Sequence, residues 1–189
     1  MTTWFTADLH FGHHNIIEYC DRPFADVDQM NRTLIDNWNS VVGAADTVWV
    51  LGDFALGKIT DTLPLTAQLS GRKILVAGNH DRCWFGHGER YEPWVDRYLE
   101  AGFARIVQGT TTLRIGDVDA VLCHFPYRGD SHDDDRFVEH RPVDDGAWLV
   151  HGHVHEQWAK EGRMVNVGVD ARSYTPISEA ALAAELTHR

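Results

Sequence analysis

The sequence has few cysteines, no long apolar run and no excess of positive charge, and each lack excludes a class of protein. Its three cysteines form no CxxC pair, which argues against a disulfide framework or a zinc ribbon. No stretch approaches the ~18 consecutive apolar residues of a membrane-spanning helix. The first residues also lack the basic segment of a signal peptide. We therefore expect a cytoplasmic protein that does not associate with membranes.

The charge balance of the chain is acidic. The sequence holds 28 Asp and Glu against 17 Lys and Arg, which gives a formal net charge of -11. Proteins that coat nucleic acid need a basic face, because counterion release drives their binding. We therefore do not expect binding to extended nucleic acid. A small phosphorylated substrate is still compatible with this charge, since bound cations can reverse the local sign inside an acidic protein.

Short apolar or β-branched runs predict eight strands, at 3–7, 47–51, 73–77, 104–108, 111–115, 119–123, 148–150 and 164–167. Helical spacing predicts helices over 26–42, 63–69 and 93–101, and Ser178 is expected to cap a last helix. Gly116 and Asp117 predict a hairpin turn. Helices and strands alternate at first, and strands then follow one another, which indicates an α/β protein with a mixed sheet or two packed sheets. The 189 residues suit one domain, 1–189.

Polar clusters directly follow five of the predicted strands. In α/β folds, ligands bind beyond the carboxyl ends of the strands, so these clusters are expected to converge. Residues two apart in an extended chain point to the same side, which pairs Asp8 with His10 and His153 with His155. The clusters are Asp8-Leu9-His10, Gly52-Asp53, Gly78-Asn79-His80-Asp81, His124 and Gly152-His153-Val154-His155.

The side chains in these clusters predict two divalent metal ions. Imidazole nitrogen and carboxylate oxygen without thiolate suit Mn, which we favour, and also Fe, Ni, Co or Zn. Seven candidate ligands exceed one tetrahedral site, but they can serve two sites if Asp53 is shared. The carboxylates of Asp8 and Asp53 balance only half of the charge of two divalent ions. The surplus would be neutralised by a hydroxide and an anionic substrate, which favours phosphate esters.

The order Asp-x-His, Gly-Asp, Gly-Asn-His-Asp, His and Gly-His-x-His resembles the calcineurin-like metallophosphoesterases. All five motifs occur in order between Asp8 and His155, and the chain looks most like the small bacterial and phage phosphoesterases of this family. The resemblance implies an α/β four-layer sandwich, in which two mixed β-sheets are flanked by helices.

The same resemblance implies a role for each residue. Asn79 and His80 would contact the substrate. His80 would protonate the leaving group, and Asp81 would orient His80. The first metal would be held by Asp8, His10 and His155, the second by Asn79, His124 and His153, and both by the bridging Asp53.

The expected activity is hydrolysis of phosphate esters by a metal-bound hydroxide. We favour a phosphodiesterase that acts on small nucleotides, including cyclic ones. A phosphomonoesterase or a protein phosphatase is an alternative, although so short a chain leaves little room for docking a protein substrate. A catalytically inactive metal-binding scaffold is another, but such a protein would not need His80 together with a complete ligand set.

For several other residues, the sequence is compatible both with a role in the site and with a structural or surface role. His13 and His14 would line the cleft or lie on the surface, and His151 is favoured as a core histidine. Arg22 and Arg82 would bind phosphate or form surface ion pairs. The acidic segment 128–146 would form a lid or a solvated loop, and we favour the solvated loop. The sequence predicts no oligomeric state.

Overall fold

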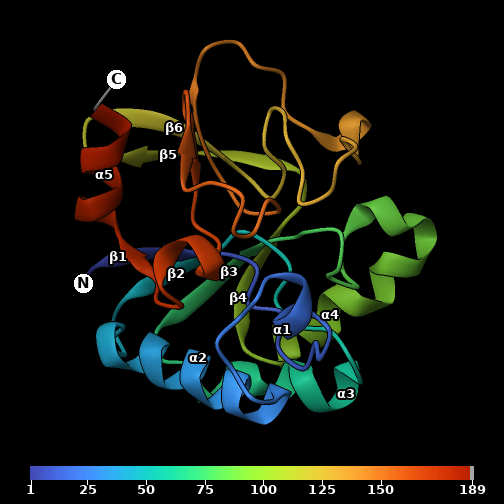
Figure 1. Ribbon diagram of the computed structural model, residues 1–189. Helices are drawn as coiled ribbons and strands as arrows, with labels where there is room; N and C mark the ends of the chain where they lie inside the picture. The colour runs from blue at the N-terminus through green and yellow to red at the C-terminus, as the bar shows by residue number, and fades with distance from the viewer. Residues whose placement is uncertain (188–189) are drawn as a thin grey trace.

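The chain folds into two five-stranded β-sheets that pack face to face with helices outside them (Figure 1). The structure is a computed structural model and describes residues 1–187. The first sheet has the order β10-β1-β2-β3-β4, with bounds Ile177–Ser178, Thr3–Thr6, Thr47–Val50, Arg72–Val76 and Phe103–Val107. The second has the order β5-β6-β7-β9-β8, with bounds Thr110–Ile115, Val118–Cys123, Trp148–His151, Met164–Asn166 and Lys160–Glu161.

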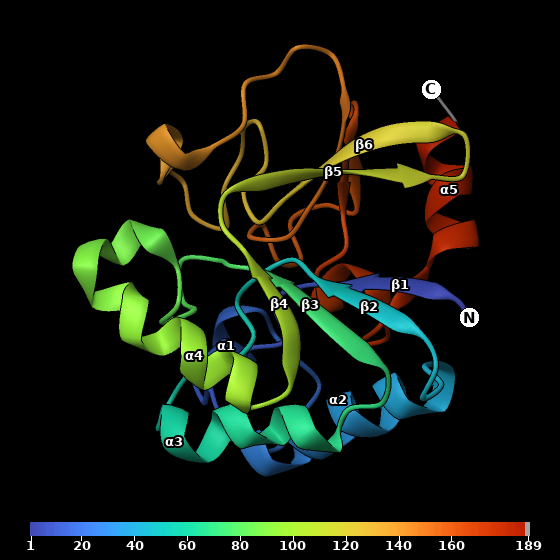
Figure 2. The same ribbon diagram turned by 180° about the vertical axis from the view of Figure 1, so that it is seen from behind.

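Both sheets are mixed. In the first, β1 to β4 run parallel and β10 pairs antiparallel with β1. In the second, β6, β7 and β9 run parallel, while β5 and β8 are antiparallel edge strands. The chain passes from the first sheet to the second through the short link between β4 and β5, which Figure 2 shows from behind. The carboxyl ends of the parallel strands of both sheets can therefore meet at one edge of the sandwich.

Side chains of the first sheet are buried on both of its faces. Along β2, Val48 and Val50 belong to the core that includes Trp38 of α2 (Val27–Val41). Trp49 and Leu51 belong instead to the core between the two sheets. Parallel strands buried on both faces read as continuous apolar runs, as this one does.

Helices α2, α3 (Ile59–Thr62) and α4 (Glu92–Glu100) lie along the first sheet, whereas α5 (Glu179–Thr187) packs beside β5, β6 and β1 (Figure 1). The longest of them, α2, has 15 residues. Within residues 1–187 no helix has the length and apolarity needed to cross a bilayer. The implied architecture, two mixed sheets flanked by helices, is confirmed.

All eight predicted strands are present, and the hairpin at Gly116 joins β5 to β6. The Oγ of Ser178 accepts a hydrogen bond from the amide of Ala181 at 3.3 Å and so caps α5 as predicted. The predicted helix over 63–69 is a 3₁₀ helix, Leu63–Gln68, that continues from α3. The sequence did not predict α1 (Ile16–Tyr19), β8 or β10, because elements of two to four residues are too short to show a periodicity.

Candidate metal centre

Four of the predicted ligands come together at the carboxyl ends of β1, β2 and β7. One ligand atom from each of Asp8, His10, Asp53 and His155 lies within 4.8 Å of the others. The Nε2 atoms of His10 and His155 are 3.2 Å apart, and His10 Nε2 lies 3.7 Å from Asp53 Oδ2. These four residues are the ones that the resemblance implied for the first metal: three ligands of that metal alone and the bridging Asp53.

A second group adjoins the first at Asp53. His124 Nε2 lies 3.4 Å from Asp53 Oδ2 and 3.1 Å from Asn79 Oδ1. The rings of His124 and His153 have centroids 5.2 Å apart. Asp53 is thus the residue that belongs to both groups, the place expected of a bridging carboxylate. The structure brings together all seven candidate ligands, four from the first sheet and three from the second.

The backbone at these ligands differs from the expected extended chain. Asp8, His10, Asp53, His153 and His155 have φ angles of 56°, 53°, 54°, 72° and 49°, in the left-handed region. Few residues other than glycine adopt this region, although Asp and His do so more often than most. The side chains of each Asp-x-His and His-x-His pair therefore converge through tight turns after the strands, and the alternation of an extended strand does not explain them.

Glycines make room for the two carboxylates. A Cβ atom at Gly78 would lie 2.5 Å from Asp53 Oδ1, and one at Gly168 would lie 2.7 Å from Asp8 Oδ2. Both distances are shorter than any normal contact, so a side chain at either position would displace the ligand. Gly78 belongs to a predicted cluster, whereas Gly168 follows β9 and carried no signal in the sequence.

Buried imidazoles of the first group are neutral. Burial lowers the pKa of His10 well below its usual value and lowers the pKa of His155 to about 3. A neutral imidazole offers a lone pair to a cation. His10 Nδ1 is also buried without a hydrogen-bond partner among residues 1–187. The Nε2 atoms of His10 and His155, which lie 3.2 Å apart, are the ring atoms that face each other in this group and could take a cation.

The carboxylates of the site are also buried. Burial raises the pKa of Asp8 well above its usual value. Burial would likewise raise the pKa of Asp53, but the charges of His124 and His80 hold it well below its usual range. In return, Asp53 outweighs burial and raises the pKa of His124 to about 9. Buried carboxylates need compensating positive charge. Two divalent cations fit this donor set in both charge and ligand chemistry.

His80 lies at the rim of a hollow of about 220 Å³ formed by this centre. Its side chain is exposed, and its ring centroid is 5.4 Å from that of His10. Its amide donates a hydrogen bond to Asp53 Oδ1 at 2.8 Å, which ties the rim to the bridging carboxylate. The lining of the hollow comprises His10, His13, Ile16, Tyr19, Asp53, Leu56, Asn79, His80, Ser131, His132, Arg136, His153 and His155.

The Asp81 carboxylate contacts backbone amides, whereas a contact with the His80 ring was expected. Its Oδ2 accepts hydrogen bonds from the amides of Asp53 and Gly78, both at 2.9 Å, and its Oδ1 accepts one from the amide of Phe54 at 3.1 Å. The carboxylate is fully buried and is engaged with the backbone rather than with the His80 ring. Asp81 therefore joins the β2 loop to the β3 loop. The interpretation of Asp81 as the residue that orients His80 stays a prediction, and these contacts give Asp81 a structural role as well.

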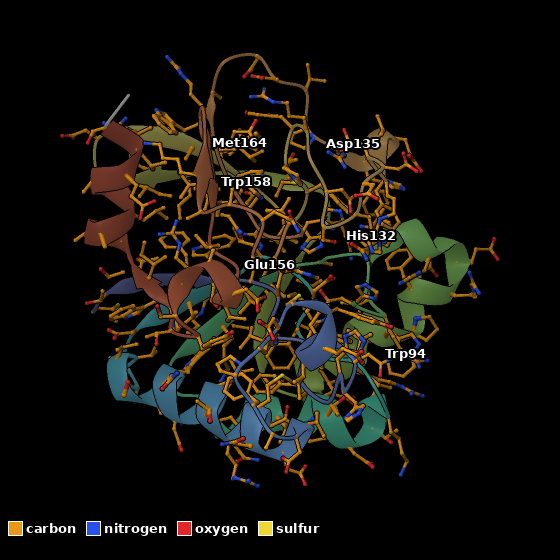
Figure 3. All side chains as sticks on the ribbon, in the orientation of Figure 1. Trp94, His132, Asp135, Glu156, Trp158 and Met164 are labelled. Atoms are coloured by element: carbon orange, nitrogen blue, oxygen red, sulfur yellow. The ribbon has the colours of Figure 1, made fainter. Side chains whose placement is uncertain are left out.

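The acidic segment after β6 supplies residues that the sequence analysis missed. Asp130 is buried, and its Oδ2 lies 2.9 Å from His153 Nε2. Arg136 and Arg141 both donate hydrogen bonds to the same carboxylate. Figure 3 labels His132 and Asp135 on this loop. No local pattern distinguishes Asp130 from its neighbours, since its role depends on contacts made across the fold.

The favoured solvated interpretation holds for much of this segment, since residues 133–135 and 143–146 are exposed. Ser131, His132 and Arg136, in contrast, line the hollow. The segment therefore lines part of the site with residues on either side of its exposed acidic tip.

The structure shows where the three histidines and two arginines that had two interpretations lie. His13 lines the hollow, whereas His14 is exposed. His151 is a core histidine, with its ring centroid 4.8 Å from that of Trp158. Arg22 is buried in an ion pair with Asp170 rather than exposed in one, while Arg82 is exposed.

Comparison with known proteins agrees with these observations. The calcineurin-like phosphoesterase superfamily domain matches residues 1–185. The chain is 35% identical to the Gene 66 protein of Mycobacterium phage L5, over 89% of this chain and 86% of the phage protein. It is 33% identical to a protein of Methanocaldococcus jannaschii, over 91% of this chain and 84% of that protein.

A solved structure shares the whole architecture. A protein of unknown function from Aquifex aeolicus superimposes with a TM-score of 0.72 and 26% identity, covering 97% of this chain and 98% of that one. The match to the family domain spans the five motifs and both sheets. This chain belongs to the calcineurin-like phosphoesterase superfamily.

Proposed function

We propose that this protein is a phosphodiesterase that hydrolyses small nucleotide-like esters with two divalent ions, Mn foremost. The observation that carries the proposal is the convergence of seven nitrogen and oxygen ligands at one place, where five of them line a small hollow with an exposed histidine at its rim. Asp8, His10, Asp53 and His155 would hold one ion. Asp53, Asn79, His124 and His153 would hold the other.

The bound ions would lower the pKa of a water molecule and neutralise charge on the phosphate oxygens. In the hydrolysis, a bond forms between phosphorus and the water oxygen, and the bond to the leaving oxygen breaks. The His80 imidazole would give the proton that the leaving alcohol keeps, since a poor leaving group departs slowly without one. Asn79 and His80 would also contact the phosphate. Asp81 would hold the loop that carries Asp53.

Three features support a small diester over a protein substrate or a scaffold role. The hollow has a volume of about 220 Å³, and Ser131, His132 and Arg136 of the segment after β6 line part of it. So short a chain also leaves little room for docking a protein substrate. His80 would be of use for any ester whose leaving alkoxide is basic, which favours catalysis over a scaffold role. A scaffold would have no need of that histidine.

A panel of chromogenic monoesters and diesters, assayed with Mn, Ni, Zn and Mg after chelation, tests the proposal. We expect no turnover in the chelated protein, recovery with Mn, and a higher kcat/KM for the diester. Full activity in protein that contains no transition metal by elemental analysis would refute metal dependence. A clear preference for monoesters would instead support a phosphatase.

A further inference from the structure

A second groove, of about 580 Å³, adjoins the hollow of the metal centre. Asn79 and His80 line both, so the groove begins where the hollow ends. Its other lining residues come from the segment between β3 and β4, which includes α4. They are Arg82, His87, Arg90 and Trp94, the last of which Figure 3 labels.

The groove is positive in a protein whose formal net charge is -11. None of the described residues that line it is a carboxylate. Arg82 and Arg90 are exposed, and within residues 1–187 neither guanidinium has a carboxylate partner within 4.0 Å. Arg22 and Arg172, in contrast, are paired with acids. What distinguishes the groove is that two unpaired guanidinium groups line it and no carboxylate among the described residues does.

Both arginines are held in position. The guanidinium carbon of Arg82 lies 4.9 Å from the centre of the Trp94 ring, and that of Arg97 lies 4.6 Å from the same centre. The Nε atom of Arg90 donates a hydrogen bond to the main-chain oxygen of His87 at 3.3 Å. The two terminal nitrogens of Arg90 take no part in that bond and can donate to a ligand. Trp94 is half-buried and already supports two guanidinium groups, so it acts as their support rather than as a free face for a nucleobase.

Guanidinium groups bind phosphate through paired, charge-assisted hydrogen bonds. The metal centre already accounts for the phosphate that reacts. His80 lies between the centre and the groove, and as the proposed general acid it marks the side on which the leaving group departs. The groove therefore lies where the leaving group of the substrate would be held.

We propose that this groove binds a second phosphate, carried by the leaving group of the substrate. This inference rests on the proposed function and narrows it. The substrate class is a small linear phosphodiester whose leaving alcohol bears another phosphate, such as a dinucleotide with a terminal phosphate. Hydrolysis breaks the bond between the central phosphorus and the leaving oxygen, consumes one water, and releases an alcohol that still carries its own phosphate. A cyclic mononucleotide has only one phosphate and would leave the groove unused.

The test compares three thymidine dinucleotides: one without a terminal phosphate, one with a 5′-phosphate and one with a 3′-phosphate. Both phosphorylated forms are needed, because either end can be the leaving group. With Mn-loaded wild-type protein, we expect one phosphorylated form to exceed the plain dinucleotide in kcat/KM by about 10- to 100-fold, the range of one or two hydrogen bonds to a charged group. The gain should lie mainly in KM, since the second phosphate is bound before and during the reaction.

Variants assign the preference to the groove. In the Arg82→Ala/Arg90→Ala double variant, the kcat/KM of the preferred phosphorylated dinucleotide should fall close to that of the plain dinucleotide, so that their ratio approaches 1. Arg105→Ala, an exposed arginine on β4, is the matched control and should keep the ratio of the wild type. Metal content and circular dichroism should be the same in all three proteins.

A wild-type ratio near 1, or a ratio that the double variant leaves unchanged, would overturn the assignment. So would a kcat/KM that keeps rising with oligonucleotide length, which would indicate an extended nucleic-acid site. Failure of the proposed function looks different, because the wild type would then hydrolyse no ester with any metal.

Discussion

Arg22 forms a buried, two-pronged ion pair with Asp170, with its Nε and Nη2 atoms 2.7 and 2.8 Å from the two carboxylate oxygens. Two further bonds run from the same guanidinium to the main-chain oxygens of Asp8 and Leu9. A residue 14 positions along the chain from Asp8 thus supports the turn that carries the first ligand.

Replacement of Arg22 by Met should destabilise the metal-free protein by about 3–5 kcal/mol, because it leaves Asp170 buried without a partner. The free energy of unfolding in urea gives the value. The Arg22→Met/Asp170→Leu double variant removes both charges and should recover much of the loss. A single variant as stable as the wild type would mean that the pair contributes little to the fold.

Asp81→Asn should weaken metal binding about 10- to 100-fold, as is typical when a residue that supports a metal ligand is changed. The asparagine amide places an NH₂ group against backbone N–H donors, so the loop that carries Asp53 should shift. Titration of the chelated protein with Mn measures the effect. Asp61→Asn, in an exposed pair with Lys58, is the control. Wild-type Mn affinity combined with a loss of rate confined to poor leaving groups would instead support Asp81 as the residue that orients His80.

Asp130→Ala should detach the 128–146 segment from the metal centre, because the Asp130 carboxylate joins Arg136 and Arg141 to His153. Limited proteolysis should then cut the segment faster, and KM should change. The Asp133→Ser/Asp134→Ser variant alters only the exposed tip and should stay within about 2-fold of the wild type in kcat/KM, as surface substitutions usually do. Equal effects of both variants would argue against the anchoring role of Asp130.

His80→Ala should lose at least ~10²-fold in kcat/KM on nucleotide diesters, within the usual contribution of a general acid. The loss should be much smaller on a nitrophenyl ester, since nitrophenolate leaves without a proton. The measurement is kcat/KM across esters of graded leaving-group pKa, with metal content checked in each preparation. A uniform loss would show that His80 positions phosphate or metal and does not protonate the leaving group.

The strands and the convergence of the site could be predicted because each depends on local pattern. Thr47–Val50 is a run of β-branched and apolar residues, and Asp53 follows it at the carboxyl end of a parallel strand. The contacts of Asp130 and Arg22 could not be predicted, since each depends on a partner that folding brings from elsewhere: His153 for one and Asp170 for the other. The backbone contacts of Asp81 could not be predicted for the same reason, because the amides that donate to it lie on two different loops.

The backbone is left-handed at five metal-ligand positions, and this lowers the free energy of unfolding of the protein. The positions are Asp8, His10, Asp53, His153 and His155. Each such residue costs on the order of 1 kcal/mol or more. Five of them amount to a sizeable share of the ~5–15 kcal/mol by which a typical domain is stable. Glycine would relax the backbone at any of these positions and would remove a ligand at the same time. Selection for thermal stability alone would therefore favour glycine at these five positions, and a centre that binds metal has to forgo that stability.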